Sequence, residues 1–186
     1  MKLAFTLLVL ALAFAPVAFA DPPNEGDFVT QVLEPTGGKI ARPKDWFYAE
    51  AHRGRVYLWT ISAEDTTGNK PYTTGVRIQT IVGVEKGTGK TAEKFLADFV
   101  ASKKSQKGVM VIKSCDKTTG ELFNRICLET EEGDDHILYS LFWGTDGLDV
   151  AVVFIAGTTK ELWDMHASTF RKMDEFELID MKRFEK

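Results

Sequence analysis

The sequence predicts an α+β fold, in which an antiparallel sheet of about seven strands is covered by helices on both faces, an α/β/α sandwich. Three observations predict it. Short runs rich in β-branched and aromatic residues follow one another at hairpin distances, separated by turns that contain Gly and Asp. Two longer runs carry apolar residues at helical spacing. Several β runs are apolar on both sides, which requires cover on both faces of the sheet.

The β runs differ in how much of their surface is apolar. RVYLWTISAE, HILYSLFW and LDVAVVFIAG are apolar on both faces and are predicted in the middle of the sheet, whereas VRIQTIVGV alternates and is predicted to be half-exposed. GVMVIKSC and ELFNRICLET predict a hairpin. FVTQVLE and GGKIARPKDWFYAE give short β candidates that Gly37, Gly38 and Pro43 break, and EFELID predicts a short closing strand or tail.

Two helices are predicted. The first follows Thr91, which is expected to cap it, and its apolar residues lie at the spacing of one helical face: Ala92, Phe95, Leu96, Phe99 and Val100. The second is expected to begin with a capping box formed by Thr158 and Glu161. Its predicted inner side is Leu162, Trp163, His166, Ala167, Phe170 and Met173.

The first twenty residues predict export. They hold one early cation, Lys2, then an uninterrupted apolar stretch, and then Ala18 and Ala20 in an A-x-A arrangement. This pattern is typical of a secretory signal peptide, here cleaved before Asp21. We therefore expect a periplasmic or secreted protein without stable membrane insertion after cleavage.

The rest of the chain suits one domain. We expect a flexible, Pro-rich lead-in at residues 21–27, a single domain at residues 28–180 and a charged tail at residues 181–186. The signal holds one of the 23 basic residues and none of the 27 acidic ones, so the mature chain carries 22 against 27, a formal charge of −5. A mildly acidic surface disfavours nucleic acid as a partner.

The stretch GVEKGTGKTAEKF invites a nucleotide-binding interpretation that its spacing excludes. A Walker A loop has Gly, four residues, and then Gly-Lys-Ser/Thr. Counted back from Gly89, the first glycine falls at Val84, and a β-branched residue does not readily take the turn conformation that the loop needs. The sequence therefore predicts a strand-to-helix connection and no nucleotide.

The order of these elements resembles that of the PsbP-like family, which includes the lumenal PsbP subunit of photosystem II and a Ran-binding nuclear import factor. The resemblance rests on Pro43 and Trp46 in ARPKDW, the strand RVYLWTISAED, the helix TAEKFLADF, the twin strands HILYSLFW and LDVAVVFIAG, and a closing helix followed by FELI. It spans about residues 28–180, and the bacterial-type leader points to an exported bacterial member. It implies an α/β/α sandwich and a role in binding or assembly rather than catalysis, and it supplies no ligand.

The segment ETEEGDDH is a candidate metal site. Carboxylates beside an imidazole suit a hard or borderline divalent cation, and the predicted ligands are Glu132, Asp134, Asp135 and His136. The alternative is an acidic hairpin connection that needs no metal. No other cofactor is expected.

The long loop at residues 63–75 is a second candidate site. Loops of this length in compact domains often carry function, and Asp65, Lys70 and Tyr72 would give it an aromatic and polar contact surface. The alternative is a floppy hairpin connection.

Two cysteines, Cys115 and Cys127, flank the turn DKTTGE. In an oxidising compartment they could form a disulfide between neighbouring strands, and the alternative is two buried thiols.

No residue pattern points to catalysis. The sequence has no GxSxG motif, and His52, His136 and His166 stand far apart. We expect an exported, non-catalytic binding or assembly module with an envelope protein as partner. The alternative is a periplasmic protein that binds a metal or small ligand through the 129–136 or 63–75 loop, and an unrecognised hydrolase is a weaker alternative.

Overall fold

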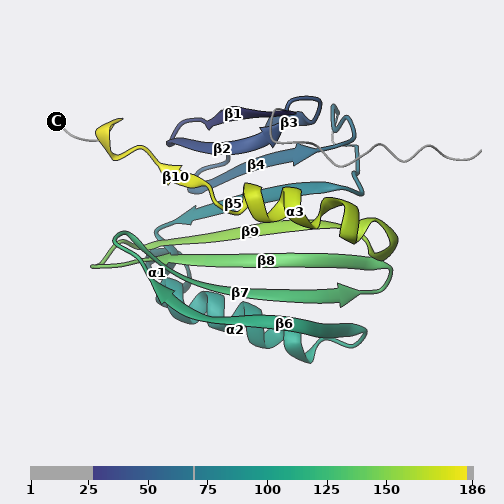
Figure 1. Ribbon diagram of the computed structural model, residues 1–186. Coiled ribbons are helices and arrows are strands. Elements are labelled where there is room, and N and C mark those ends of the chain that lie inside the picture. The colour runs from purple at the N-terminus through teal and green to yellow at the C-terminus, as the bar shows by residue number, and fades with distance from the viewer. Residues whose placement is uncertain (1–26, 69, 184–186) are drawn as a thin grey trace, which may run out of the picture.

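The computed structural model describes residues 27–68 and 70–183 (Figure 1). The predicted signal peptide, all but the last residue of the lead-in and the last three residues of the tail lie outside this part of the chain. Within it, no helix has both the length and the apolar character needed to cross a membrane.

The described strands form two antiparallel sheets. The larger has seven strands in the order β3-β4-β5-β9-β8-β7-β6, and the smaller has the order β1-β2-β10. The strands are β1 Phe28–Leu33, β2 Gly37–Pro43, β3 Phe47–Glu50, β4 Val56–Ser62, β5 Gly75–Val82, β6 Val109–Thr119, β7 Phe123–Glu132, β8 Asp135–Gly144, β9 Val150–Thr159 and β10 Glu177–Ile179. The helices are α1 Val84–Thr88, α2 Ala92–Ser105 and α3 Trp163–Met173, with 3-10 turns η2 at Lys160–Leu162 and η3 at Met181–Arg183.

Hairpins generate most of the large sheet. β6 to β9 follow one another as a meander, and β9 returns to pair with β5 along the register from Gly75↔Gly157 to Val82↔Val150. The β7–β8 turn is only two residues long and contains Gly133, whose φ of 62° lies in the left-handed region that favours glycine. The central position of β8 and β9 confirms the prediction from their apolar character.

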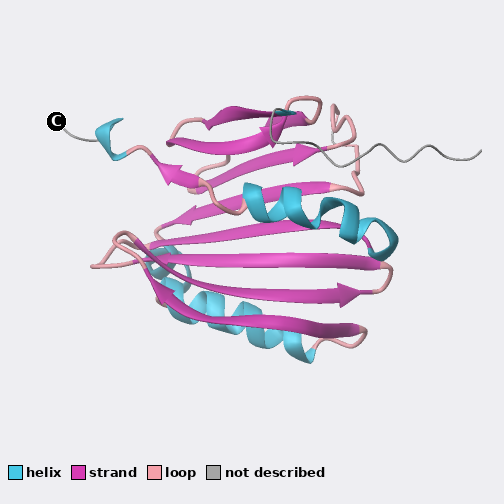
Figure 2. Ribbon diagram, viewed as in Figure 1, coloured by secondary structure: helices cyan, strands magenta, loops and turns pink. Residues whose placement is uncertain are grey.

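The two faces of the large sheet bury separate apolar clusters. Along β9, Val152 and Phe154 pack in one cluster with α3, while Ala151 and Val153 pack in the other with α2. Figure 2 shows α3 on the near side of the sheet and α2 on its far side. We call these sides the α3 face and the α2 face.

Helices cover only part of each face. On the α3 face the small sheet joins α3 in covering the core, through Leu33 and Ile40. On the α2 face the β4–β5 end is open, because Arg77 is exposed and Leu58, Thr60 and Gln79 are only half-buried. The prediction of a mostly antiparallel sheet is confirmed, whereas helical cover of both whole faces is not what the structure shows.

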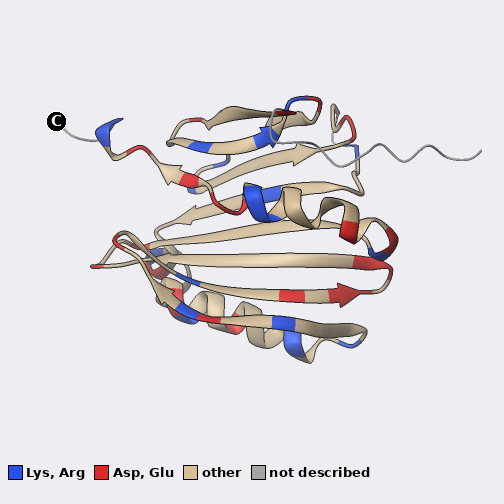
Figure 3. Cartoon of the chain, in the orientation of Figure 1, with Lys and Arg blue, Asp and Glu red and all other residues tan. Residues whose placement is uncertain are grey.

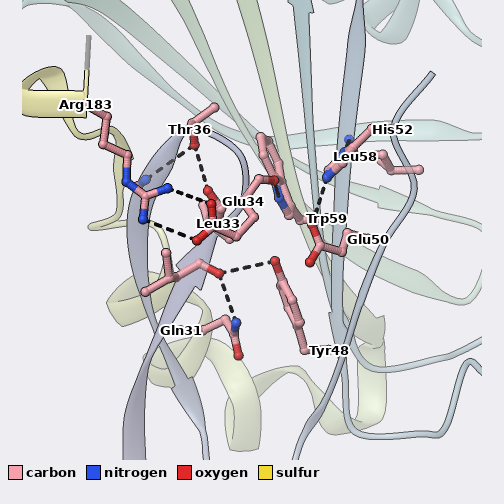
Figure 4. Close-up of polar contacts among 12 residues, drawn as sticks. Gln31, Leu33, Glu34, Thr36, Tyr48, Glu50, His52, Leu58, Trp59 and Arg183 are labelled. Carbon is pink, nitrogen blue, oxygen red and sulfur yellow. Dashed lines mark hydrogen bonds and ion pairs between the residues drawn. The ribbon is translucent and has the colours of Figure 1, made fainter. Parts of the chain in front are cut away.

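The small sheet is tied to the large one by polar contacts (Figure 4). The Trp59 indole of β4 donates to the main-chain oxygen of Glu34 at 2.8 Å, and the Tyr48 hydroxyl donates to the oxygen of Val32 at 3.3 Å. Arg183 in turn donates to both carboxylate oxygens of Glu34, at 2.6 and 3.2 Å. These bonds place Trp59, which is fully buried, between the sheets.

Gly37 and Pro43 are the first and last residues of β2, so they mark breaks between the short β candidates as the sequence predicted. Gly38 lies inside the strand and does not break it. A Cβ on Gly38 would come within 2.3 Å of the main-chain oxygens of Glu177 and Leu178, so this glycine allows β10 to lie against β2. The prediction misplaced β4, which lies next to the edge strand β3 rather than in the middle.

Candidate functional site

The strongest candidate site is the open half of the α2 face, which comprises β3, β4, β5 and the adjoining ends of β8 and β9. The 63–75 loop lies beside it, and Tyr72 lines two hollows. The first hollow, of about 370 Å³, is lined by Tyr72, Gly75, Asp135, Ile137, Ile155 and Gly157, among others. The second, of about 330 Å³, is lined by Tyr72, Glu50, Leu58, Thr60, Lys70 and Arg77, among others.

Glycine determines where Tyr72 packs. A Cβ on Gly75 would lie 2.6 Å from the main-chain oxygen of Ile61 and 2.9 Å from the Tyr72 ring, so the ring occupies space that only glycine leaves free. Gly75 pairs with Gly157 across β5 and β9, and both glycines line the first hollow. Burial raises the pKa of the Tyr72 hydroxyl, which is protonated at neutral pH even without this shift.

Hydrogen bonds hold both ends of the loop. At its C-terminal end the Glu64 carboxylate accepts from the main-chain N–H of Thr73 at 3.1 Å and of Thr74 at 3.3 Å. The Thr74 and Thr158 hydroxyls, both buried, share a hydrogen bond of 2.7 Å. The ends of the loop are therefore anchored to the sheet rather than floppy.

The three predicted loop residues do different things. Asp65 accepts from the hydroxyl and the main-chain N–H of Thr67, at 2.5 and 2.9 Å, and these bonds lower the pKa of its carboxyl. Lys70 lies 3.6 Å from Asp65 in an exposed ion pair. Lys70 and Tyr72 line the second hollow together, whereas Asp65 shapes the loop.

Sequence reasoning missed the side chains that complete this surface. Arg77 and Thr60 are paired on adjacent strands and both line the second hollow. The signal for Arg77 was present in the alternation of VRIQTIV, which places Arg77 and Gln79 on the face opposite the buried Val76 and Ile78. Periodicity does not show that this half of the face lacks a covering helix.

The structure does not bring the predicted metal ligands together. Glu132 lies on the α2 face and accepts from Lys103 and the Tyr139 hydroxyl, each at 2.6 Å. His136 lies on the α3 face, 2.8 Å from Glu129 and stacked on Trp163 with ring centroids 3.8 Å apart. Burial tends to raise the pKa of Glu132, but the bonds from Lys103, Tyr139 and Thr130 lower it overall.

The other two predicted ligands also lie in different places. Asp134 lies in the turn between β7 and β8, and Asp135 lines the first hollow. Figure 3 shows the acidic residues at this hairpin end of the sheet. Among the described residues, no group of three or more His, Cys, Asp or Glu side chains is arranged to hold a metal ion.

The two cysteines are joined. Cys115 and Cys127 are direct partners in the β6–β7 register, with Cα atoms 5.1 Å apart, and their sulfurs form a disulfide. Of the two alternatives that the sequence left open, the structure supports the disulfide.

Comparisons with known proteins show the fold and not the family. No family model and no curated protein sequence matches this chain. The solution structure of cyanobacterial PsbP from Synechocystis is similar with a TM-score of 0.52 and 14% identity, over 88% of this chain and 99% of that one. A Pseudomonas aeruginosa protein of unknown function, described as a putative regulator, matches with a TM-score of 0.42 and 11% identity, over 78% of this chain and 92% of that one. The likeness to cyanobacterial PsbP confirms the predicted PsbP-like fold.

Proposed function

We propose that this protein is an exported, non-catalytic binding or assembly module of the cell envelope that contacts a protein partner through the open half of the α2 face. The observation that carries the proposal is Tyr72, held against Gly75 between two hollows on an otherwise uncovered stretch of sheet. The PsbP-like fold agrees with a non-enzymatic module. The leader pattern of residues 1–20 is the reason to place the protein in the periplasm or outside the cell.

The chemistry of this surface suits a protein partner. Protein interfaces are enriched in Tyr and Arg, because these side chains combine a large contact area with hydrogen-bonding groups. Tyr72 and Arg77 provide this pair, and Lys70 and Glu50 add charges of both signs at the same hollow. A partner could place one side chain on each side of the Tyr72 ring.

Site-specific photo-crosslinking in the native envelope tests the proposal. Ala49 is exposed on β3 and lines the second hollow, and its side chain carries no part of the proposed contact. A photoreactive amino acid at this position should give a discrete adduct with one protein, and Tyr72→Ala in the same chain should remove it, because the partner loses its aromatic contact. The matched control is the same amino acid at Lys104, an exposed residue of α2. An identical adduct from both positions, or none from position 49, would show that this face does not bind a partner.

A periplasmic small-ligand protein is the second candidate. It is favoured by the volumes of the two hollows, about 370 and 330 Å³, which fall in the range of small-molecule pockets. A divalent cation at Glu132, Asp134, Asp135 and His136 stays a prediction, for which calorimetric titration with calcium, zinc and manganese is the test.

A further inference from the structure

A third cavity lies on the α3 face, away from the Tyr72 surface. It has a volume of about 290 Å³ and is walled mainly by apolar side chains from β7, β8, β9 and the segment after α3: Phe123, Phe142, Val152, Phe176 and Leu178. The Phe142 and Phe176 rings meet edge to face with centroids 5.6 Å apart, and Phe176 stacks on Phe154 at 5.5 Å. The aromatic wall is therefore built from a packed set of rings.

One charged side chain, Arg125, lines this cavity. Its guanidinium lies 5.5 Å from the centroid of the Phe142 ring. Its Nη2 donates to the Ser140 hydroxyl at 3.0 Å and to the Asp174 carboxylate, and Ser140 donates to the same carboxylate oxygen at 2.9 Å. The Asp174 side chain is only 8% exposed, so this network is buried at its acidic end.

The network leaves Nη1 of the guanidinium without a hydrogen bond to a described residue. All the hydrogen bonds that Arg125 makes to described residues come from Nη2, and its Nε is buried without a partner. The second oxygen of Asp174, Oδ1, is also buried without a partner among the described residues. Because Nε is buried and Nη2 is engaged, a ligand in the cavity would meet the guanidinium at Nη1.

The geometry points to a ligand class. A guanidinium N–H group donates a charge-assisted hydrogen bond to a carboxylate, and aromatic walls favour an apolar body. At the ~30 Å³ that one water molecule occupies in the liquid, the cavity holds roughly ten non-hydrogen atoms. We propose that this cavity binds a small monocarboxylate with an aliphatic or aromatic body, its carboxylate on Arg125 and its body among Phe123, Phe142 and Phe176.

Calorimetric titration of the purified full chain tests this site. Octanoate is a monocarboxylate with an aliphatic body, and 3-phenylpropionate is a monocarboxylate with an aromatic body. The uncharged counterpart of octanoate is 1-octanol. We expect saturable binding of at least one carboxylate at one site per chain, at least about tenfold weaker binding of octanol, and a similar loss for octanoate with Arg125→Gln. Equal affinity for octanol and octanoate, or no saturable binding of either acid, would overturn the proposal.

A second pair of variants keeps the test decisive if Arg125→Gln does not fold. Thr118 is exposed, lines the cavity and pairs with Arg125 across β6 and β7. Because position 118 is at the surface, Thr118→Trp should block the cavity without disturbing the packed interior. Ser114→Trp is the matched control, because Ser114 is exposed on the same strand and does not line the cavity. Retained binding in Thr118→Trp, or equal loss in both variants, would also overturn the proposal.

The test of carboxylate binding and the photo-crosslinking test of the proposed function can fail independently of each other. Tyr72→Ala should leave carboxylate binding unchanged, because Tyr72 lines hollows on the α2 face and the carboxylate cavity lies on the α3 face. Thr118→Trp should likewise leave the adduct from position 49 unchanged.

Discussion

His166 of α3 shows how burial determines what a histidine can do. Its ring packs near Trp46 and Phe170, with centroid distances of 5.9 and 6.0 Å, and its Nδ1 is buried without a partner among the described residues. Burial lowers the pKa of His166, and the charge of Glu64 opposes this only in part. His166 is half-buried, which agrees with its predicted place on the inner side of the helix, although its hydrogen bonding is incomplete.

This burial predicts a pH dependence of stability. Because the folded-state pKa of His166 lies below the 6.5 of the free side chain, protonation favours the unfolded chain. The stability that the neutral ring contributes is fully present above pH 6.5 and is lost as the pH falls through the lower pKa of the folded state. His166→Phe should therefore lose less stability than the wild type between neutral pH and about pH 5, as measured by urea unfolding at both values. Equal losses of stability in the wild type and in His166→Phe would show that His166 does not titrate in this way.

At the scale of elements, the GKT stretch is a connection between β5 and α2. Gly83 and Gly89 have φ values of 71° and 70°, on either side of the short helix α1. The Thr91 hydroxyl accepts from the main-chain N–H of Lys94 at 3.2 Å and so caps α2, as the sequence predicted. Lys90 pairs at the surface with Asp98, at 2.9 Å.

Neighbouring substitutions in this stretch should differ in effect. Thr91→Ala should lower the free energy of unfolding by ~1 kcal/mol, because it removes the cap. Lys90→Ala should lower it by less than ~0.5 kcal/mol, because exposed ion pairs contribute little. Urea unfolding of both variants gives the comparison. A larger loss from Lys90→Ala than from Thr91→Ala, or loss of the adduct from position 49 in Lys90→Ala, would mean that this lysine has a role beyond the connection.

The start of α3 is an element that the sequence placed wrongly. Thr158 does not cap a helix: it lies in β9, where it pairs with His136 and bonds to Thr74. β9 continues to Thr159, and a 3-10 turn without a side-chain cap precedes the helix at Trp163. Strand pairing replaces the predicted capping box, because Thr158 and Thr159 of β9 pair with His136 and Asp135 of β8.

Strand β6 shows how an exposed edge is protected from pairing with another chain. Three consecutive large apolar residues are exposed on it: Met110, Val111 and Ile112. Irregularities in its register between Val111 and Lys113 and between Cys115 and Thr118 interrupt the straight edge, and Lys113 and Lys117 add charge. Bulges and lysines of this kind disfavour edge-to-edge association.

At the scale of the molecule, the two cores share their central strands. Successive residues of β8 and β9 point alternately into the α3-side and α2-side clusters, as Leu138 and Tyr139 do. Loss of packing on either face therefore weakens the same strands, and we expect the described domain to unfold as one unit.

Truncation of one buried residue on each face tests this coupling. Leu96→Ala in α2 should cost ~2–5 kcal/mol and Phe170→Ala in α3 ~3–5 kcal/mol, since both side chains are fully buried. Each variant should show a single transition at lower denaturant concentration, coincident by circular dichroism and tryptophan fluorescence. Two separate transitions in either variant would show that the faces unfold independently.

Most of the fold was predictable, because it follows from the local pattern of apolar residues. Continuous apolar runs identified the two-sided strands β8 and β9, alternation identified the half-exposed strand β5, and the spacing of Leu96 and its neighbours identified α2. These signals depend on residues a few positions apart. The sequence therefore determined by itself the type and order of the main elements, and the cap at Thr91.

The candidate sites were decided by tertiary structure. Arg125 meets Asp174 across 49 residues of chain, and Tyr72 packs on Gly75 only because the loop folds back onto β5. Glu132 and His136 are four positions apart in the chain, yet the register of the β7–β8 hairpin places them on opposite faces. A shift of one residue in register moves every side chain of a strand to the other face. The faces of these two residues therefore follow only once the two-residue turn and the packing of both apolar clusters have fixed the register.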